Sequence, residues 1–213
     1  MKPMSHTSLV ESFSLLCPWL ALVCLMQFVA GRCGIRRRGA MRLLILGLLA
    51  AGVLALPIRG FTVALWIRGI EANFSILFTV LLAGVVWEGE FHRRLFAGRE
   101  RFTGWVFGML GSLFLYPLAL GLGNFDPYEW GWRFSPLFVS SAALCGLLIW
   151  QQNRLGLVLL LAIVAYHLGL LESKNYWDYL VDPVYFVVSV LVLLFGLISR
   201  FRRPQPEEAE GAT

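Results

Sequence analysis

The sequence predicts an all-α protein, a polytopic bundle of about seven transmembrane helices, and three observations lead to that prediction. Hydrophobic residues make up 58% of the 213 residues and charged residues only 15%, whereas soluble domains carry about 25% charged residues. The apolar residues form runs close to the roughly 17–25 residues that a helix needs to cross a bilayer. The basic residues gather in every second gap between these runs. Because lipid cannot pair backbone N–H and C=O groups, each run is expected to be helical.

The apolar runs define seven predicted spans in order along the chain. They cover residues 13–31, 43–58, 74–87, 104–122, 136–150, 155–171 and 183–199. The third run is short for a crossing, and the stretch 59–73 before it mixes apolar residues with Arg59 and Arg68. This stretch is expected to be either an interfacial helix or a kinked extension of the second span beyond Pro57. Neither alternative changes the number of crossings.

Local signals support the fourth, fifth and seventh spans. Ser135–Pro136 and Asp182–Pro183 each place an N-cap residue before a proline at the first helical position. In the fourth span, Gly104 and Gly108 lie on one face and permit close approach of another helix. We expect this face to pack inside the bundle.

Orientation follows from the basic residues, because the cytoplasmic loops of membrane proteins hold the excess of Lys and Arg. Of the 18 basic residues, thirteen fall on one predicted side and five on the other. The N-terminus is therefore predicted outside and the C-terminus in the cytoplasm. The compact arginine-rich loops indicate a bacterial inner membrane. We interpret the arginines at 36–38 as a topology determinant beside anionic headgroups, and we expect no nucleic-acid partner.

The chain is predicted to be one domain. No linker or change of composition precedes residue 200, so residues 1–203 form a single transmembrane helical domain. The acidic tail at 204–213 is predicted to be disordered and cytoplasmic. No Walker-type loop, nucleophile elbow, zinc spacing or dinucleotide fingerprint is present, and we expect no cofactor.

Two loops on the predicted outer side have similar compositions. Residues 124–130 read NFDPYEW and residues 175–179 read NYWDY. Each loop combines asparagine, aromatic rings and aspartate between the end of one span and the start of the next. Duplication of a helix pair and convergence on one capping chemistry both explain the likeness. If the helices form a bundle, the two loops can meet over one mouth.

These loops contain the candidate functional residues. The catalytic candidates are Asp126, Glu129 and Asp178. The substrate-binding candidates are Tyr128, Trp130, Glu172, Lys174, Asn175, Trp177 and Asp182. Two carboxylates in a partly apolar setting can divide into an acid and a base, and aromatic rings can position a cationic headgroup. The structural alternative is that the rings anchor the interface and that Asp126 and Asp182 form a turn and a helix cap.

Two further patterns have a chemical and a structural interpretation. Glu88 and His92 share a helix face at i and i+4 and would suit a metal, whereas Glu90 and Arg94 are expected to form a surface ion pair. His167 is the one histidine inside a predicted span, and we expect it to bond a neighbouring helix. A haem would need a second histidine at the same depth, and the sequence has none.

Three functions are compatible with these patterns. The first is a non-catalytic accessory or partner subunit of an envelope system for lipid, glycan or transport, because catalytic signatures are missing. The second is a small integral-membrane enzyme that acts on a lipid or lipid-linked headgroup at the outer leaflet through the acidic, aromatic loops. The third is a transporter or channel. The expected partners are membrane lipids and either another membrane protein or a second copy of the chain.

Overall fold

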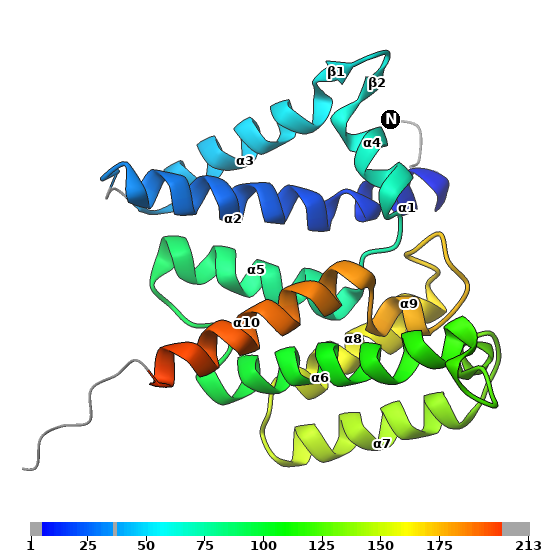
Figure 1. Cartoon of the computed structure of the whole chain (residues 1–213). Helices are drawn as coiled ribbons and strands as arrows, with labels where there is room; N and C mark the ends of the chain where they lie inside the picture. Colours follow the sequence, from blue (N-terminus) through cyan, green and yellow to red (C-terminus); the bar gives the residue numbers. More distant parts are fainter. Residues whose placement is uncertain (1–5, 36–37, 202–213) are drawn as a thin grey trace, which may run out of the picture.

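The helices run lengthwise beside one another in the computed structural model, which describes residues 6–35 and 38–201 (Figure 1). The principal helices are α2 (Leu16–Arg32), α3 (Ala40–Ala55), α5 (Ile76–Phe91), α6 (Gly98–Pro117), α7 (Pro136–Trp150), α8 (Leu155–His167) and α10 (Pro183–Phe201). The short elements are α1 (His6–Ser14), β1 (Pro57–Ile58), β2 (Phe61–Thr62), α4 (Val63–Ile70), the π-helical turn η1 (Leu118–Leu122), the 3-10 turn η2 (Pro127–Gly131) and α9 (Trp177–Leu180). The all-helical prediction is confirmed, apart from the two-residue strands of one hairpin.

Three described helical segments are long and apolar enough to cross a membrane. They are Val10–Arg32, Gly98–Leu122 and Trp177–Arg200. The helices α3, α7 and α8 are apolar but shorter. Large apolar side chains remain exposed on the outside of the bundle, among them Leu48 at 65% and Phe195 at 67%. Exposed apolar side chains in this number suit contact with lipid, and together with the long apolar helices they support a helical membrane protein.

The connections between helices fall at two ends of the bundle (Figure 1). One end holds the connections after α2, α5 and α7 and the end of α10; we refer to it as the basic end, because Arg32, Arg93, Arg154 and Arg200 lie there. The opposite end holds α1 and the connections after α3, α6 and α8, and we refer to it as the acidic end. These four arginines, which the sequence assigned to one side of the membrane, therefore lie at one end of the bundle. The predicted tail at 204–213 lies outside the described residues.

Glycines of α6 allow it to pack closely on α10 and α5. A Cβ atom at Gly108 would lie 2.5 Å from Cζ of Tyr185, and one at Gly104 would lie 3.0 Å from Leu81. Tyr185 is fully buried and donates its hydroxyl hydrogen to the carbonyl oxygen of Gly104. The expected role of this small-residue face in packing within the bundle is confirmed.

The structure of residues 59–73 excludes one of the two predicted alternatives, the kinked extension of the second span. Arg59 and Gly60 both have positive φ angles, of 50° and 87°, and form the two-residue turn between β1 and β2. Such a turn reverses the chain, so the stretch is not a kinked extension of the second span. The separate helix α4 then begins after Thr62, whose side-chain oxygen accepts a hydrogen bond from the N–H of Leu65.

Candidate functional site

The two acidic, aromatic loops lie against each other at the acidic end. The first loop contains η2 and the second contains α9. Nε1 of Trp177 donates to the carbonyl oxygen of Pro127 at 2.8 Å. The backbone N–H of Tyr176 donates to the carbonyl oxygen of Gly131 at 2.9 Å. The expectation that the two loops meet is confirmed by these contacts.

Asn175 fits against a glycine of the first loop. A Cβ atom at Gly131 would lie 1.7 Å from Oδ1 of Asn175, so only glycine leaves room for this side chain. Asn175 is fully buried, its Nδ2 donates to the carbonyl oxygen of Tyr128, and its Oδ1 accepts from the N–H of Trp177. The amide nitrogen therefore joins the two loops and the amide oxygen fixes the turn of its own loop, whereas the sequence predicted a substrate-binding role.

The tryptophans of the two loops belong to an aromatic cluster around Phe114 of α6. The ring centre of Phe114 lies 6.1 Å from that of Trp177 and 6.4 Å from that of Trp130. Trp130 also stacks on Phe125 at 5.6 Å. Such pairs contribute about 0.5–1.5 kcal/mol each beyond their buried area. Trp177 is only 5% exposed, so its ring offers little surface to a headgroup.

Asp178, a predicted catalytic residue, lies at the contact between the loops. The hydroxyl of Tyr128 donates to Oδ2 of Asp178 at 3.0 Å, and both side chains are half-buried. Burial, and after it the negative charge of Asp178, raises the pKa of Tyr128 above its ordinary value of 10.0. The phenol therefore stays protonated at physiological pH and remains a hydrogen-bond donor to the carboxylate.

Asp182 joins the starts of two helices. Its Oδ1 accepts from the N–H of Tyr185 at 2.8 Å, which caps α10. Its Oδ2 accepts from both the N–H and the hydroxyl of Ser75, at 2.9 and 2.7 Å, and Ser75 is the N-cap of α5. Asp182 is 2% exposed. The predicted capping role accounts for the bond of Oδ1 only. No local pattern in the sequence indicates the bond to Ser75, which lies 107 positions away.

Glu71 is a third carboxyl group in this region, and the sequence did not connect it with the loops. It lies in the connection between α4 and α5, is half-buried, and accepts from the N–H of Asn73 at 2.9 Å. Burial raises the pKa of Glu71 above its ordinary value of 4.5, and the charges of Asp182 and Asp178 raise it further. The three carboxyl groups, which we name the acidic group, therefore share one electrostatic environment.

The other four candidate residues lie at the surface. Asp126 is exposed and caps η2, because its Oδ1 accepts from the N–H of Tyr128 at 2.8 Å. Glu172 forms an ion pair with Arg68, while Glu129 and Lys174 are exposed. Among the described residues, no group of three or more His, Cys, Asp or Glu side chains has the arrangement of a metal site.

The two patterns around α5 are corrected by the structure. Glu88 pairs with Arg94 at 3.0 Å and with Arg101 at 2.7 Å, and His92 contacts Arg38, so Glu88 and His92 do not share a ligand. Glu90 does not pair with Arg94. It is buried and faces Arg42 at 3.4 Å, because α5 extends beyond the predicted span and carries Glu90 against α3.

His167 also differs from the expectation. It is exposed at the C-terminal end of α8, and its Nδ1 lies 2.9 Å from the carbonyl oxygen of Ile163 in the same helix. The helix ends at this residue, four positions before the predicted end of the span, so the histidine does not reach a neighbouring helix.

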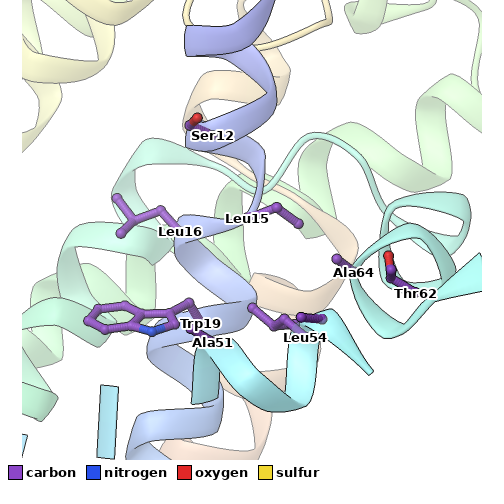
Figure 2. A pocket seen from close by; sticks show the side chains of 9 residues that line it. Ser12, Leu15, Leu16, Trp19, Ala51, Leu54, Thr62 and Ala64 are labelled. Atoms are coloured by element: carbon purple, nitrogen blue, oxygen red, sulfur yellow. The ribbon is translucent and has the colours of Figure 1, made fainter. Parts of the chain in front are cut away.

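An apolar groove opens near the acidic end between α2, α3 and α4 (Figure 2). It has a volume of about 450 Å³, and Trp19, Leu16 and Leu54 contribute to its walls. Its hydroxyl groups come from Ser12 and Thr62, and no charged side chain lines it within the described residues. The acidic group, and not this groove, holds the groups capable of acid–base chemistry at this end.

Comparison with protein-family models, with curated proteins and with solved structures finds no match. No relative therefore indicates the chemistry of the acidic end, which we infer from its own residues. They are Glu71, whose pKa is raised, Asp178 and Asp182, which accept hydrogen bonds from neutral donors, and Tyr128, whose phenol stays protonated.

Proposed function

We propose that this protein is a multi-pass bacterial inner-membrane protein, a non-catalytic subunit that binds a partner in an envelope system for lipid, glycan or transport. In this proposal the seven principal helices cross the membrane, with the acidic end outside and the basic end in the cytoplasm. The grouping of the arginines at one end supports the orientation, because cytoplasmic ends hold the basic excess.

The observation that carries the proposal is the interlocking of the two loops at the acidic end. Asn175 and Trp177, both predicted to bind substrate, form hydrogen bonds that join the loops. Asp182 caps α10 and holds Ser75, and Asp126 caps η2. Side chains that form such contacts make the acidic end rigid and are not available to bind a substrate. A rigid surface of this kind suits the docking of a partner better than catalysis.

The outer half of α7 offers a surface for the partner. Trp132 and Phe134, just before this helix, are 55% and 83% exposed. Next to them lies an apolar groove of about 570 Å³, which includes Ser140 and Ala143. Small side chains let another transmembrane helix approach closely, so the groove suits a helix of a partner protein or of a second copy.

Native mass spectrometry of the protein, gently extracted from its own membrane, tests the proposal. We expect a stoichiometric second protein or a second copy of the chain. The substitutions Trp132→Ala and Phe134→Ala should release it. Trp150→Ala provides the matched control, because Trp150 is equally exposed, at 82%, but lies at the opposite end of α7. A monodisperse, partner-free single chain would contradict the proposal.

The second candidate function is an enzyme acting on a lipid or lipid-linked headgroup at the outer leaflet. The observation that favours it is Glu71, whose raised pKa and two carboxylate neighbours suit a proton donor beside a base. Incubation of the purified protein with lipids from its own membrane, followed by mass spectrometry, should then reveal a product. Glu71→Gln and Asp178→Asn should abolish it, while Glu129→Gln, at an exposed position, should retain it. An unchanged lipid profile with the unsubstituted protein rejects this function.

A further inference from the structure

A second groove, at the basic end, combines apolar walls with arginines. It has a volume of about 700 Å³ and lies between α5, α6 and α10. Arg101 and Arg200 line it nearest the end of the bundle, and Trp105, Met109, Val192 and Gly196 line it further in. Four other grooves formed by the described residues have no charged lining residue. Along the helix axes, the groove is therefore polar near the basic end and apolar toward the middle of the bundle.

The length of the groove matches one leaflet of a bilayer. Arg101 and Met109 are eight residues apart on α6, and Val192 and Arg200 are eight apart on α10. At 1.5 Å per residue the groove extends about 12 Å along each helix, compared with roughly 15 Å for half of a hydrocarbon core. A molecule lying in it would have its polar part at the arginines and its apolar part within the leaflet.

The arginines retain capacity for an anion. Arg200 is exposed, and we find no ion-pair partner for it among the described residues. Arg101 pairs with Glu88 through Nη1 at 2.7 Å, which leaves other N–H groups of its guanidinium available. Arginine binds phosphate through several parallel N–H donors, so the two side chains suit a phosphodiester group.

Trp105 provides a polar group one helical turn further in. Trp105 is 8% exposed, and its indole N–H forms no hydrogen bond with the described residues. This N–H is not one of the fully buried unpartnered polar atoms, so it remains accessible to a ligand in the groove. The ester carbonyl of a glycerolipid would lie at this depth if the phosphate lay between the arginines.

From these features we infer that the groove binds one anionic glycerophospholipid of the adjacent leaflet. Its phosphate contacts Arg200 and Arg101, and one acyl chain lies along Gly196 and Met109. An apolar partner helix in the same place would cover Arg200 without a counter-charge, which is costly in a membrane. The inference requires that the bundle lies in a membrane, but it does not depend on the proposed partner subunit.

Native mass spectrometry of delipidated protein, titrated with phosphatidylglycerol and with phosphatidylcholine of the same acyl chains, tests the inference. The unsubstituted protein should prefer the anionic lipid. Arg200→Gln should weaken phosphatidylglycerol binding roughly tenfold, because a charge-assisted contact contributes about 1.5–3 kcal/mol. Arg93→Gln is the matched control, since it removes the same charge from the basic end outside the groove.

Gly196→Leu tests the apolar part separately. A Cβ atom at Gly196 meets nothing within 4 Å, so a side chain can be added at this position of the groove, and the substitution keeps both arginines in the sequence. It should weaken the binding of both lipids by similar factors. Arg200→Gln should weaken phosphatidylglycerol binding more than phosphatidylcholine binding, because the ammonium group of phosphatidylcholine already balances the charge of its phosphate. Equal weakening by Arg93→Gln and Arg200→Gln, or full binding by Gly196→Leu, would overturn the inference. An unchanged melting temperature of each variant confirms that it is folded.

Discussion

The two ends of the bundle hold their carboxylates by different means. At the basic end, Glu90 is buried against the guanidinium of Arg42, and Glu88 pairs with two arginines. At the acidic end, Asp182 is equally buried but accepts hydrogen bonds only from backbone N–H groups and the hydroxyl of Ser75. Asp178 is likewise held by the phenol of Tyr128. The buried Glu90 at the basic end therefore has a counter-charge, whereas Asp182 and Asp178 at the acidic end have only neutral donors.

The difference separates structural from candidate functional positions. A carboxylate paired with an arginine in a buried place contributes to specific packing and has no capacity left for a ligand. A carboxyl group held only by neutral donors has no counter-charge, and the burial of such a group lowers stability. Proteins often retain a destabilising buried polar group of this kind at a functional site. The acidic end therefore remains the candidate site, whether it binds a partner or a headgroup.

The largest effect is expected from breaking the balance at the basic end. Glu90→Gln leaves Arg42, whose side chain is 12% exposed, without its counter-charge. Removing one partner of a buried ion pair costs roughly 3–5 kcal/mol, so the free energy of unfolding should fall by about that amount. Unfolding by SDS titration in mixed micelles, followed by near-UV circular dichroism, measures it. The double variant Glu90→Leu with Arg42→Met should lose less, and a loss below about 1 kcal/mol for Glu90→Gln would contradict the assigned pairing.

A smaller effect is expected from Asp182→Ala at the acidic end. The substitution removes the N-cap of α10, and the loss of such a cap lowers the free energy of unfolding by about 0.5–2 kcal/mol. It also leaves the N–H and hydroxyl of Ser75 without their acceptor. We expect a loss of about 2–3 kcal/mol in the same unfolding measurement, less than for Glu90→Gln because no buried cation is left behind. Ser75→Ala removes the hydroxyl bond to Asp182 and also the side-chain cap of α5, so it should cost about 1–2 kcal/mol. A loss for Asp182→Ala smaller than that for Ser75→Ala would contradict the assigned cap of α10.

Sequence reasoning was most successful where a local signal marks an element. The start of α7 follows Ser135–Pro136, and the start of α10 follows Asp182–Pro183, as predicted from capping. The predicted segments each overlap one principal helix, because apolar runs specify helices in lipid. The meeting of the two loops also follows from the alternation of the helices between the two ends.

The predictions were wrong where contacts between residues far apart in the sequence determine the structure. The prediction ended the third span at residue 87, but α5 continues to Phe91 because Arg42 and Gln27 neutralise and bond Glu90. No local pattern in a single sequence encodes those partners. The hairpin turn at Arg59 and Gly60 was missed because its first residue is not one of the usual turn formers. The interaction of Glu71 with Asp178 and Asp182 was not predicted, since these two residues are more than a hundred positions away in the sequence.

The smallest effect is expected from Glu71, and it sharpens the comparison most directly. Because its folded pKa is raised, the native state binds more protons than the unfolded chain between the ordinary value of 4.5 and the raised value. The contribution of Glu71 to stability is therefore largest at low pH and is lost as pH rises through that interval. The difference between the unsubstituted protein and Glu71→Gln, measured by unfolding at several pH values, isolates this group from other carboxyls. Glu88→Gln is the control at the basic end. If the difference for Glu71→Gln shows no slope above pH 4.5, the pKa of Glu71 is not raised, and neither its burial nor the charges of Asp182 and Asp178 destabilise its ionised form.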